Sequence, residues 1–563
     1  MRMTETSDLW WKNAVVYCLD VETFFDSNDD GIGDFDGLSN RIDYLAEVGV
    51  TCLWLMPFFP TADRDDGYDI EDFTAIDPRL GDFGDFVEMI RTAKDRGMRV
   101  VADLVINHTS DQHPWFKEAR KSKDNPYRDY YVWRDTEPPD TSDQVVFPDE
   151  EDSLWEFDER TGEWFLHNFY KHQPDLNITN PKVRDEISKI IGFWMQLGLD
   201  GFRVDAVPYL VETSQADLSR SEEFGDPHDY LRQIKAFMGR RKGEAILLGE
   251  VNVTYDEQVG FFGESGDELT MQFDFELMQQ MYLALARADA TPMVETLRRR
   301  PELARHNQFA CFVRNHDELT LDKLSDSERQ EVFDAFGPDP DMQLFDRGLR
   351  RRLPPMLDGD PRRIRMVYSL LFALPGTPVL FYGEEIGMGE NLDVPGRLAV
   401  RTPMQWSADD NGGFSRAKPS KLASKVTDGA FGPAHVNVAD QRKDPDSLLS
   451  FVSALSRRYR QSPELGMGAF EVLDHDVPAV LAHRCTWDQP GDPGASTLLV
   501  HNLGSDATEI TVTLDDIEEG STVHELFTDE HLTVGAGGEL TIPVDGYGHL
   551  WFRLHKPGDV RLP

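Results

Sequence analysis

Short apolar runs alternate with longer amphipathic stretches along most of this chain, and no other feature constrains its fold as strongly. This alternation is typical of βα units, in which a helix returns the chain so that the next strand lies parallel to the last. Seven runs are clear and an eighth, at residues 271–275, is weaker. The clear runs cover residues 15–19, 51–56, 100–106, 201–206, 245–248, 310–313 and 378–382. Eight such units predict an α/β fold, the (β/α)₈ or TIM barrel.

Polar or charged residues lie at or just beyond the ends of four of these runs. They are Asn107 with His108, Asp205, Glu250, and the triplet Asn315, His316 and Asp317. In a (β/α)₈ barrel the active site is assembled at the carboxyl ends of the strands, whereas residues within the strands pack the core. A charged residue that merely begins a loop explains one such case, but it explains four poorly. We therefore expect an active site at this end of the barrel.

Three segments interrupt or follow the barrel, which we expect at residues 1–108 and 180–467. Residues 109–179, after the third run, are rich in Trp, Tyr, Pro and Asp and predict an inserted, loop-rich domain that walls the pocket. Residues 318–363 are a polar insertion within the barrel. At residues 468–563, short strands with Gly, Asp and Pro turns predict a C-terminal antiparallel β domain, a β-sandwich.

The charge of the chain narrows the choice of partners. Asp and Glu number 102 against 57 Lys and Arg, which gives a formal net charge of −45. This excess opposes binding to nucleic acid or to an anionic membrane, and a neutral small molecule fits better. A solvated surface suited to a salty cytoplasm explains the excess better than an acidic patch for a protein partner.

Cysteine spacing and hydropathy favour a cytoplasmic protein. The four cysteines, at positions 18, 52, 311 and 485, lack the CxxC spacing of a zinc site and suggest no disulfide framework. Residues 1–12 hold no apolar run of the signal-peptide type, and no stretch of 18 apolar residues occurs elsewhere. We expect no organic cofactor, and the chain can be a homo-oligomer.

Two of the strand-end carboxylates have the chemistry that a retaining glycosidase needs. Cleavage with retention uses two carboxyl groups about 5–5.5 Å apart, one as nucleophile and one as general acid/base. Arg203 stands two residues before Asp205 on the same side of a strand, so it can keep Asp205 ionised. Glu250 ends an apolar run, where burial raises a carboxyl pKa toward that of a general acid. Asp317 adds a third acidic group that can stabilise an oxocarbenium-like transition state.

The acidic stretch after the first run has the spacing of a calcium loop. Its expected ligands are Asp26, Asn28, Asp30, Ile32 and Asp34. Oxygen ligands at alternate positions with a glycine at the sharp turn are the chemistry of Ca²⁺ or Mg²⁺ binding. Gly37 stands where an EF-hand has its last glutamate, and an acidic turn without a metal is the alternative.

Taken together, these motifs resemble those of the α-amylase superfamily, glycoside hydrolase family 13. The matching segments are residues 65–70 (DDGYDI), 103–108 (DLVINH), 173–177 (QPDLN), 201–205 (GFRVD), Glu250, 315–317 (NHD), 378–383 and 401–406 (RTPMQW). The resemblance implies Asp205 as nucleophile, Glu250 as general acid/base and Asp317 as transition-state stabiliser.

The same resemblance implies the residues around the sugar and a second ion. The glucosyl unit would be held by Asp65, Tyr68, His108, Arg203, His316 and Arg401. A second structural Ca²⁺ near the pocket would be bound by Asn107, Asp175, the carbonyl groups of Tyr209 and Leu210, and Glu212.

Within the superfamily the chain is most similar to trehalose synthases. That similarity lies at residues 314–321 (RNHDELTL), 383–388 (GEEIGM), 401–407 (RTPMQWS) and 436–445 (VNVADQRKDP). It implies interconversion of maltose and trehalose by transfer of a glucosyl unit within the pocket. The small Ala206 after the nucleophile resembles relatives that act on α-1,4 linkages.

Two alternatives remain open at this point. One is an α-glucosidase that hydrolyses maltose, trehalose or short α-glucosides with the same residues. The other is a non-catalytic protein like the ectodomains of amino-acid transporter heavy chains, which the three intact carboxylates disfavour. Two segments depart from trehalose synthases: residues 17–22 read YCLDVE instead of YELHVR, and residues 249–252 read GEVN instead of AEAN.

Overall fold

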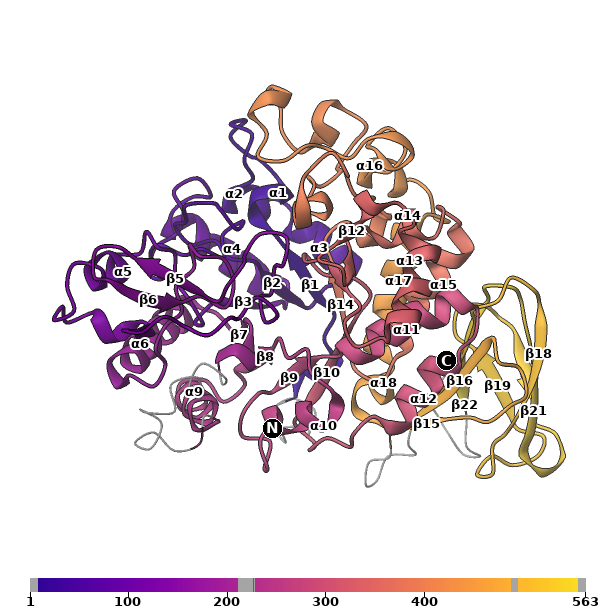
Figure 1. The fold of residues 1–563 in the computed structure, drawn as a ribbon. Helices are drawn as coiled ribbons and strands as arrows, with labels where there is room; N and C mark the ends of the chain where they lie inside the picture. The colour runs from indigo at the N-terminus through magenta and orange to yellow at the C-terminus, as the bar shows by residue number, and fades with distance from the viewer. Residues whose placement is uncertain (1–8, 211–225, 227, 488–494, 555–563) are drawn as a thin grey trace.

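The computed structural model of the chain describes residues 9–210, 226, 228–487 and 495–554. Eight parallel strands close into a barrel in the order β1-β14-β10-β9-β8-β7-β3-β2 (Figure 1). Their bounds are Val16–Leu19 (β1), Cys52–Leu55 (β2), Arg99–Leu104 (β3), Gly201–Val204 (β7), Ile246–Gly249 (β8), Met271–Phe273 (β9), Gln308–Phe312 (β10) and Thr377–Phe381 (β14). All eight predicted runs are therefore strands of a TIM barrel, including the weak one.

Helices cover the outside of the barrel, so nearly every strand residue is buried on both faces. This is why the strands appear in the sequence as continuous apolar runs without alternation. The longer helices are α4 (Phe83–Asp95), α6 (Pro181–Leu197), α9 (Asp229–Gly239), α11 (Phe275–Arg287), α12 (Thr291–Arg299), α15 (Pro361–Ala373) and α17 (Leu448–Gln461). Local signals set their starts: Asp82 and Asp85 form a capping box at α4, and Asn180 caps α6 ahead of Pro181.

The segment between β3 and α6 stands apart from the barrel and is purple in Figure 1. It holds the short helix α5 (Pro114–Ala119) and a three-stranded antiparallel sheet of β4 (Trp133–Arg134), β6 (Glu163–Leu166) and β5 (Trp155–Asp158). An antiparallel bridge between His108 and Asp175 ties the end of this segment back to the end of β3. The segment thereby lies beside the carboxyl ends of the strands.

A second segment outside the barrel, named the second excursion, follows β10. It contains β11 (Leu319–Thr320), helix α13 (Asp326–Phe336), and the hairpin of β12 (Gln343–Leu344) and β13 (Gly348–Leu349), followed by α14 (Leu353–Met356). The three strands form a small antiparallel sheet in the order β11-β13-β12.

The C-terminal part, yellow in Figure 1, is an antiparallel β domain, as the sequence predicted. One sheet has the order β15-β16-β17-β22-β19-β20 and the other pairs β18 with β21. The bounds are Ala469–Val472 (β15), Val480–Trp487 (β16), Ala495–Asn502 (β17), Thr508–Thr513 (β18), Thr522–Glu525 (β19), His531–Thr533 (β20), Glu539–Val544 (β21) and His549–Leu554 (β22). Residues of both sheets share one apolar cluster, and Trp551 and His501 hydrogen-bond to Ser369 on α15.

None of the helices in the described parts of the chain is long and apolar enough to cross a membrane.

Candidate active site

A single guanidinium group connects the two carboxylates expected to carry out the chemistry. Arg203, on β7, contacts Asp205 through Nη1 and lies 2.9 Å from Glu250 Oε2 through Nη2. Glu250 Oε2 also accepts the backbone N–H of Ala206 at 3.0 Å. Asp205 follows β7 and Glu250 follows the neighbouring strand β8, so adjacent strand ends place the two groups together.

Burial makes both of these carboxylates harder to ionise. It raises the pKa of Glu250 to about 7 and that of Asp205 to about 6, although Arg203 opposes both shifts. Near neutral pH Asp205 is therefore more ionised than Glu250, which retains more of its proton. An ionised carboxylate is suited to nucleophilic attack and a protonated one to acid catalysis, which matches the expected roles.

Behind this pair lies a fully buried carboxylate that the sequence did not single out. Asp103, on β3, lies 2.5 Å from Arg203 and accepts the indole N–H of Trp54 at 2.7 Å. Because the Arg203 side chain is only 1% exposed, this third carboxylate partner fixes the direction of its guanidinium. Asp103 is thus a positioning residue for Arg203.

Asp317 lies among groups that keep it ionised. Arg397 and Arg401 lie 2.6 and 3.1 Å from its Oδ1 atom, and the ring of His316 lies 3.1 Å from Oδ2. Burial alone would raise the pKa of Asp317, but these neighbours outweigh it and hold the pKa well below its usual range. A permanent negative charge there can stabilise a positively charged transition state.

The expected sugar-holding residues form one connected network around Asp317. The hydroxyl of Tyr68 lies 2.7 Å from His316 Nε2 and their rings stack. Arg401 donates from Nε to the carbonyl of His316 at 2.8 Å. Close by, His108 Nε2 lies 3.3 Å from the carbonyl of Tyr68. Asp65 accepts a hydrogen bond of 2.8 Å from Gln173.

Sequence analysis missed Arg397, which joins two parts of this network. Its guanidinium lies 2.6 Å from Asp317 and 2.9 Å from Asp65. Its spacing of four residues from Arg401 was the one sign in the sequence that could have indicated this role. In the structure the 3₁₀ helix Gly396–Val400 spans this interval, and both arginines reach Asp317.

Part of this network borders a cavity of about 400 Å³, a size suited to a small ligand. Asp205 and the expected sugar-holding residues Asp65, Tyr68, His108, Arg203, His316 and Arg401 are not among the described residues that line it. Glu250, Asp317, Ala206 and Arg397 line it on the barrel side. The remaining walls come from residues 144–147 and Phe169 of the inserted segment, Pro208, Tyr209, Asn252, Val253, Phe275, Asn315, and Glu318, Thr320, Asp322, Lys323 and Arg347 after β10.

The acidic loop at residues 26–34 is a tight turn with the donor set of a calcium site. Asp26 accepts the backbone N–H groups of Asn28, Asp29 and Gly31, and Asp34 accepts that of Gly37. Gly31 has φ +106°, and a Cβ there would meet the carbonyl of Lys421 at 2.2 Å, so only glycine fits. Asp26 Oδ1 accepts two of these bonds and Asp34 Oδ2 accepts the N–H and hydroxyl groups of Ser27, so these two oxygens are saturated within the turn. Asp26 Oδ2 and Asp34 Oδ1 each accept one hydrogen bond and keep one lone pair for an ion.

Two of the residues expected at the second ion lie side by side. Leu176 N donates to the carbonyl of Asn107 at 2.8 Å, which brings Asp175 next to the end of β3. The Oδ1 atom of Asn107 is buried without a hydrogen-bond partner among the described residues. An orphaned buried oxygen fits a cation, whereas the carboxylate of Asp175 accepts hydrogen bonds from the backbone and side-chain amides of Asn168. Tyr209 packs on Phe169 and Leu210 is buried, whereas Glu212 lies outside the described residues.

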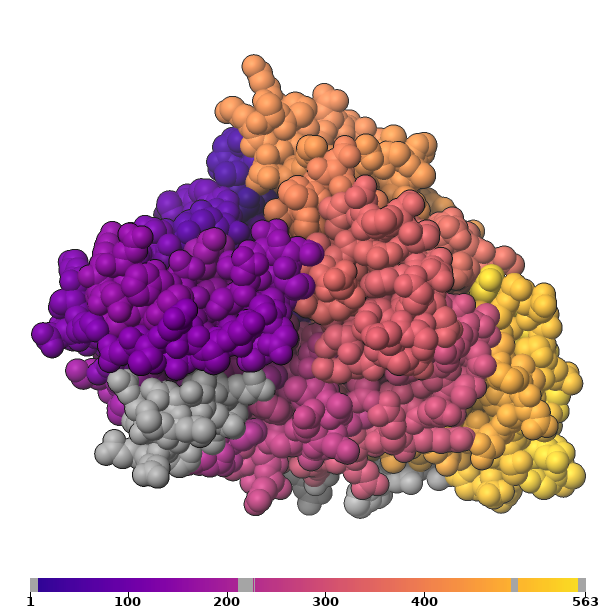
Figure 2. Space-filling model, viewed as in Figure 1, coloured from indigo at the N-terminus to yellow at the C-terminus, as the bar shows by residue number. Residues whose placement is uncertain are grey.

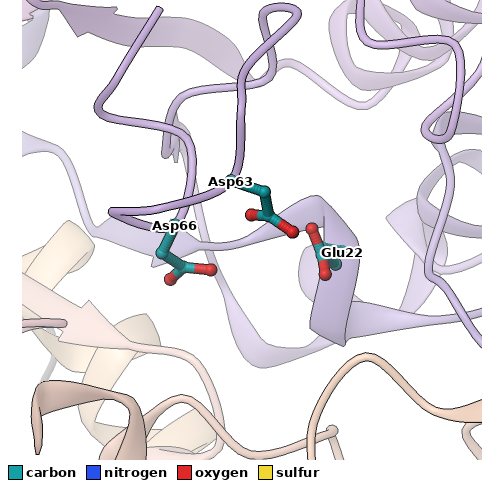
Figure 3. A group of neighbouring side chains, drawn as sticks. All are labelled: Glu22, Asp63 and Asp66. Atoms are coloured by element: carbon teal, nitrogen blue, oxygen red, sulfur yellow. The ribbon is translucent and has the colours of Figure 1, made fainter. Parts of the chain in front are cut away.

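A further cluster consists of three acidic side chains (Figure 3). Carboxylate oxygens of Glu22, Asp63 and Asp66 lie within 4.8 Å of one another. Arg79 lies 2.9 Å from Asp63 and 3.3 Å from Glu22, and Asp66 pairs with Arg401. Burial raises the pKa of Glu22 to about 9, so this carboxyl group is largely protonated.

Comparisons with known proteins agree with this geometry. The catalytic-domain model of α-amylases matches residues 20–332 and 351–468. The chain is 40% identical to a trehalose synthase of Pimelobacter sp. (strain R48), covering 98% of this chain and 97% of that protein. It is 31% identical to an oligo-1,6-glucosidase of Parageobacillus thermoglucosidasius, with 85% and 88% covered.

Among solved structures, an α-glucosyl transfer enzyme superposes with a TM-score of 0.76 at 27% identity, covering 97% of this chain and 99% of that one. The barrel, the strand-end carboxylates and these matches lead to one conclusion: the chain belongs to the α-amylase family, glycoside hydrolase family 13.

Proposed function

We propose that this enzyme interconverts maltose and trehalose by moving a glucosyl unit within its pocket. The observation that carries the proposal is the contact of Arg203 with both Asp205 and Glu250, together with the position of Glu250 and Asp317 in the wall of a cavity of about 400 Å³. The similarity to trehalose synthases over 98% of the chain supports this choice among the activities of the family.

In the first half-reaction Asp205 attacks the anomeric carbon of the glucosyl unit. The bond from that carbon to the glycosidic oxygen breaks, and Glu250 gives its proton to the departing oxygen. A β-glucosyl ester of Asp205 and a free glucose result. Asp317 stabilises the positive charge that develops on the sugar ring, and Arg397 and Arg401 keep Asp317 ionised.

In the second half-reaction the glucose turns within the cavity and presents a different hydroxyl group. Glu250, now ionised, removes the proton of that hydroxyl, whose oxygen attacks the anomeric carbon and releases Asp205. Attack by the 1-hydroxyl gives trehalose and attack by the 4-hydroxyl gives maltose. Water in the place of glucose would give hydrolysis, so this chemistry depends on exclusion of water.

The second candidate is an α-glucosidase that uses the same residues with water as the acceptor. The 31% identity to an oligo-1,6-glucosidase and the change at Val251, directly after Glu250, support it. The two functions share the first half-reaction and differ only in the acceptor.

We further propose two structural calcium sites. The first would use Asp26, Asn28, Asp30, Asp34 and the carbonyl of Ile32, and the second Asn107, Asp175, Glu212 and the carbonyls of Tyr209 and Leu210. Bound Ca²⁺ would brace the loops next to the barrel end without joining the sugar chemistry.

A cytoplasmic location fits the four cysteines, all of which are free and buried. The acidic excess disfavours nucleic acid and membrane partners, and assembly into a homo-oligomer is compatible with the chain.

Product analysis by NMR tests the proposed function. The purified enzyme is incubated with maltose and, separately, with trehalose, while both disaccharides and free glucose are followed over time. Interconversion with little glucose supports the isomerase, and glucose as the main product from both substrates contradicts it in favour of the hydrolase.

A further inference from the structure

The β12–β13 hairpin joins two walls of the cavity. Its turn consists of Phe345, Asp346 and Arg347, and Arg347 lines the cavity together with Val146 and Phe147 of the inserted segment. In the space-filling view the inserted segment (purple) and the second excursion (salmon) abut (Figure 2). The hairpin lies within residues 333–350, the stretch that the α-amylase model leaves unmatched, so it is not part of the family's common core.

Arg347 makes a polar link between these walls. It donates from Nη1 to the carbonyl of Val146 at 2.6 Å and from Nη2 to Glu318 Oε1 at 3.0 Å. Glu318 directly follows Asp317, and its side chain is only 8% exposed. One partly buried guanidinium therefore ties the inserted segment to the strand end that carries a catalytic carboxylate. A planar group with diverging donors is suited to such a bridge.

Phe345 adds an apolar contact next to this link. Its ring lies 5.0 Å from the ring of Phe147, centroid to centroid. Phe147 in turn stacks on Tyr170 at 4.4 Å and lies beneath the guanidinium of Arg397 at 5.0 Å. The contact thus continues to the arginine that holds Asp317 and Asp65.

The backbone of this turn adopts a conformation that is unfavourable by itself. Phe345 and Asp346 have φ values of 57° and 53°, in the left-handed region that is unfavourable for residues with a side chain. Nevertheless the Phe345 ring is only 6% exposed. Packing on Phe147 offsets the unfavourable conformation in the structure.

We propose that Arg347 and Phe345 form a clasp that retains the leaving glucose in the cavity and keeps water out. The clasp then sets how the glucosyl unit on Asp205 is divided between glucose and water. This inference rests on the proposed function, because only a transferring enzyme needs to retain its leaving group. Arg347 is a positioning residue, since its partners are Val146 and Glu318 and not the carboxylates that react.

The test compares Arg347→Ala and Phe345→Gly with the wild type. Phe345→Gly removes the ring and also relieves the left-handed backbone, so its effect does not arise from strain. Arg329→Ala is the matched control, because Arg329 belongs to the same excursion and pairs with Asp326 on the surface of α13. Melting temperatures of all variants establish that they are folded.

Two measurements are made on each variant. The first is the ratio of free glucose to isomerised disaccharide after incubation with maltose. The second is the rate at which deoxynojirimycin, a glucose-like iminosugar, leaves the enzyme, measured by stopped-flow displacement. We expect Arg347→Ala to raise both by about tenfold, as for the loss of one hydrogen bond to a charged group. Arg347→Lys keeps the charge but cannot reach both partners at once. Its two values should therefore lie between those of the wild type and those of Arg347→Ala.

The release rate decides the inference independently of the proposed function. If the wild type forms only glucose, the isomerase function is wrong, yet a faster release from Arg347→Ala and Phe345→Gly still supports the clasp. Release rates equal to that of Arg329→Ala in both variants overturn the clasp, whatever the product ratio shows.

Discussion

Arg397 donates a hydrogen bond from Nη1 to Oδ1 of Asp317 at 2.6 Å, although the two residues are 80 positions apart in the chain. The other arm of the same guanidinium reaches Asp65, so one side chain sets the distance between two residues expected to contact the sugar.

Replacement of Arg397 therefore affects catalysis more than folding. We expect Arg397→Ala to lower kcat/KM by a factor of at least about 30, since loss of one partner of a buried charge pair costs roughly 2–5 kcal/mol. Steady-state kinetics with maltose check this. Arg397→Lys serves as the charge-preserving control and should recover only part of the loss; an Arg397→Ala enzyme with normal kcat/KM would contradict the role.

The assignment of nucleophile and acid is tested by two isosteric changes. Asp205→Asn and Glu250→Gln should each lower kcat by about 10²–10⁴ or more, the loss typical of a missing acid/base group. Asp95→Asn, an exposed change on α4, is the matched control. Near wild-type turnover in either active-site variant would exclude the proposed roles.

The pH dependence follows from the two raised pKa values. Asp205, with a pKa of about 6, must be ionised, so activity should fall as the pH decreases below about 6. Glu250, with a pKa of about 7, must be protonated, so activity should fall as the pH rises above about 7. A plot of kcat/KM against pH should be a narrow bell. Residual activity of Glu250→Gln should lose the alkaline limb; a limb that persists would assign it to another group.

Acid should destabilise the contact between the barrel and the C-terminal domain. Burial lowers the pKa values of His483 and His549 to about 4 and that of His501 well below its usual range. In the unfolded chain these groups titrate near 6.5. The unfolded state therefore binds more protons below about 6.5, and stability is lost as the pH falls from there toward 4.

Melting temperatures measured from about pH 8 down to about pH 4 check this loss. This range spans the pKa of about 6.5 of a histidine in the unfolded chain. His549→Gln should reduce the slope, because it removes one group that must stay neutral in the folded state. The exposed His435→Gln is the control and should leave the slope unchanged. A melting temperature that does not depend on pH in this range would disprove the prediction.

Chelation should lower the melting temperature. A cation that binds only the folded state adds stability of RT ln(1 + [L]/Kd), about 2.7 kcal/mol at a hundredfold excess over Kd. EDTA should therefore shift the wild-type melting curve downward, and Asp26→Asn should reduce that shift. Asp410→Asn, a surface change nearby, should not. If EDTA has no effect on the wild type, the loop at residues 26–34 binds no structural metal.

The barrel could be predicted from the sequence because its strands are buried on both faces. Full burial requires apolar residues throughout each run, and this local requirement is visible without any tertiary information. The catalytic carboxylates could be located for a related reason. Asp205, Glu250 and Asp317 lie at or shortly beyond the ends of such runs, and in a parallel barrel all strand ends lie on one side.

The long-range contacts around this site could not be predicted in the same way. Arg397 meets Asp317 and Asp65, Arg347 meets Val146, and Arg79 meets Glu22, each across a long separation in sequence. Their positions depend on the paths of loops, and neither periodicity nor composition encodes the path of a loop.

The sequence by itself determined the barrel, the C-terminal β domain and the three strand-end carboxylates, because each follows from local burial and strand order. Only the tertiary structure decided which arginine meets which carboxylate, how far burial raises the pKa values of Asp205 and Glu250, and which loops join over the cavity. The physical reason is that ion pairs and desolvation depend on distances of a few ångströms between residues far apart in the chain.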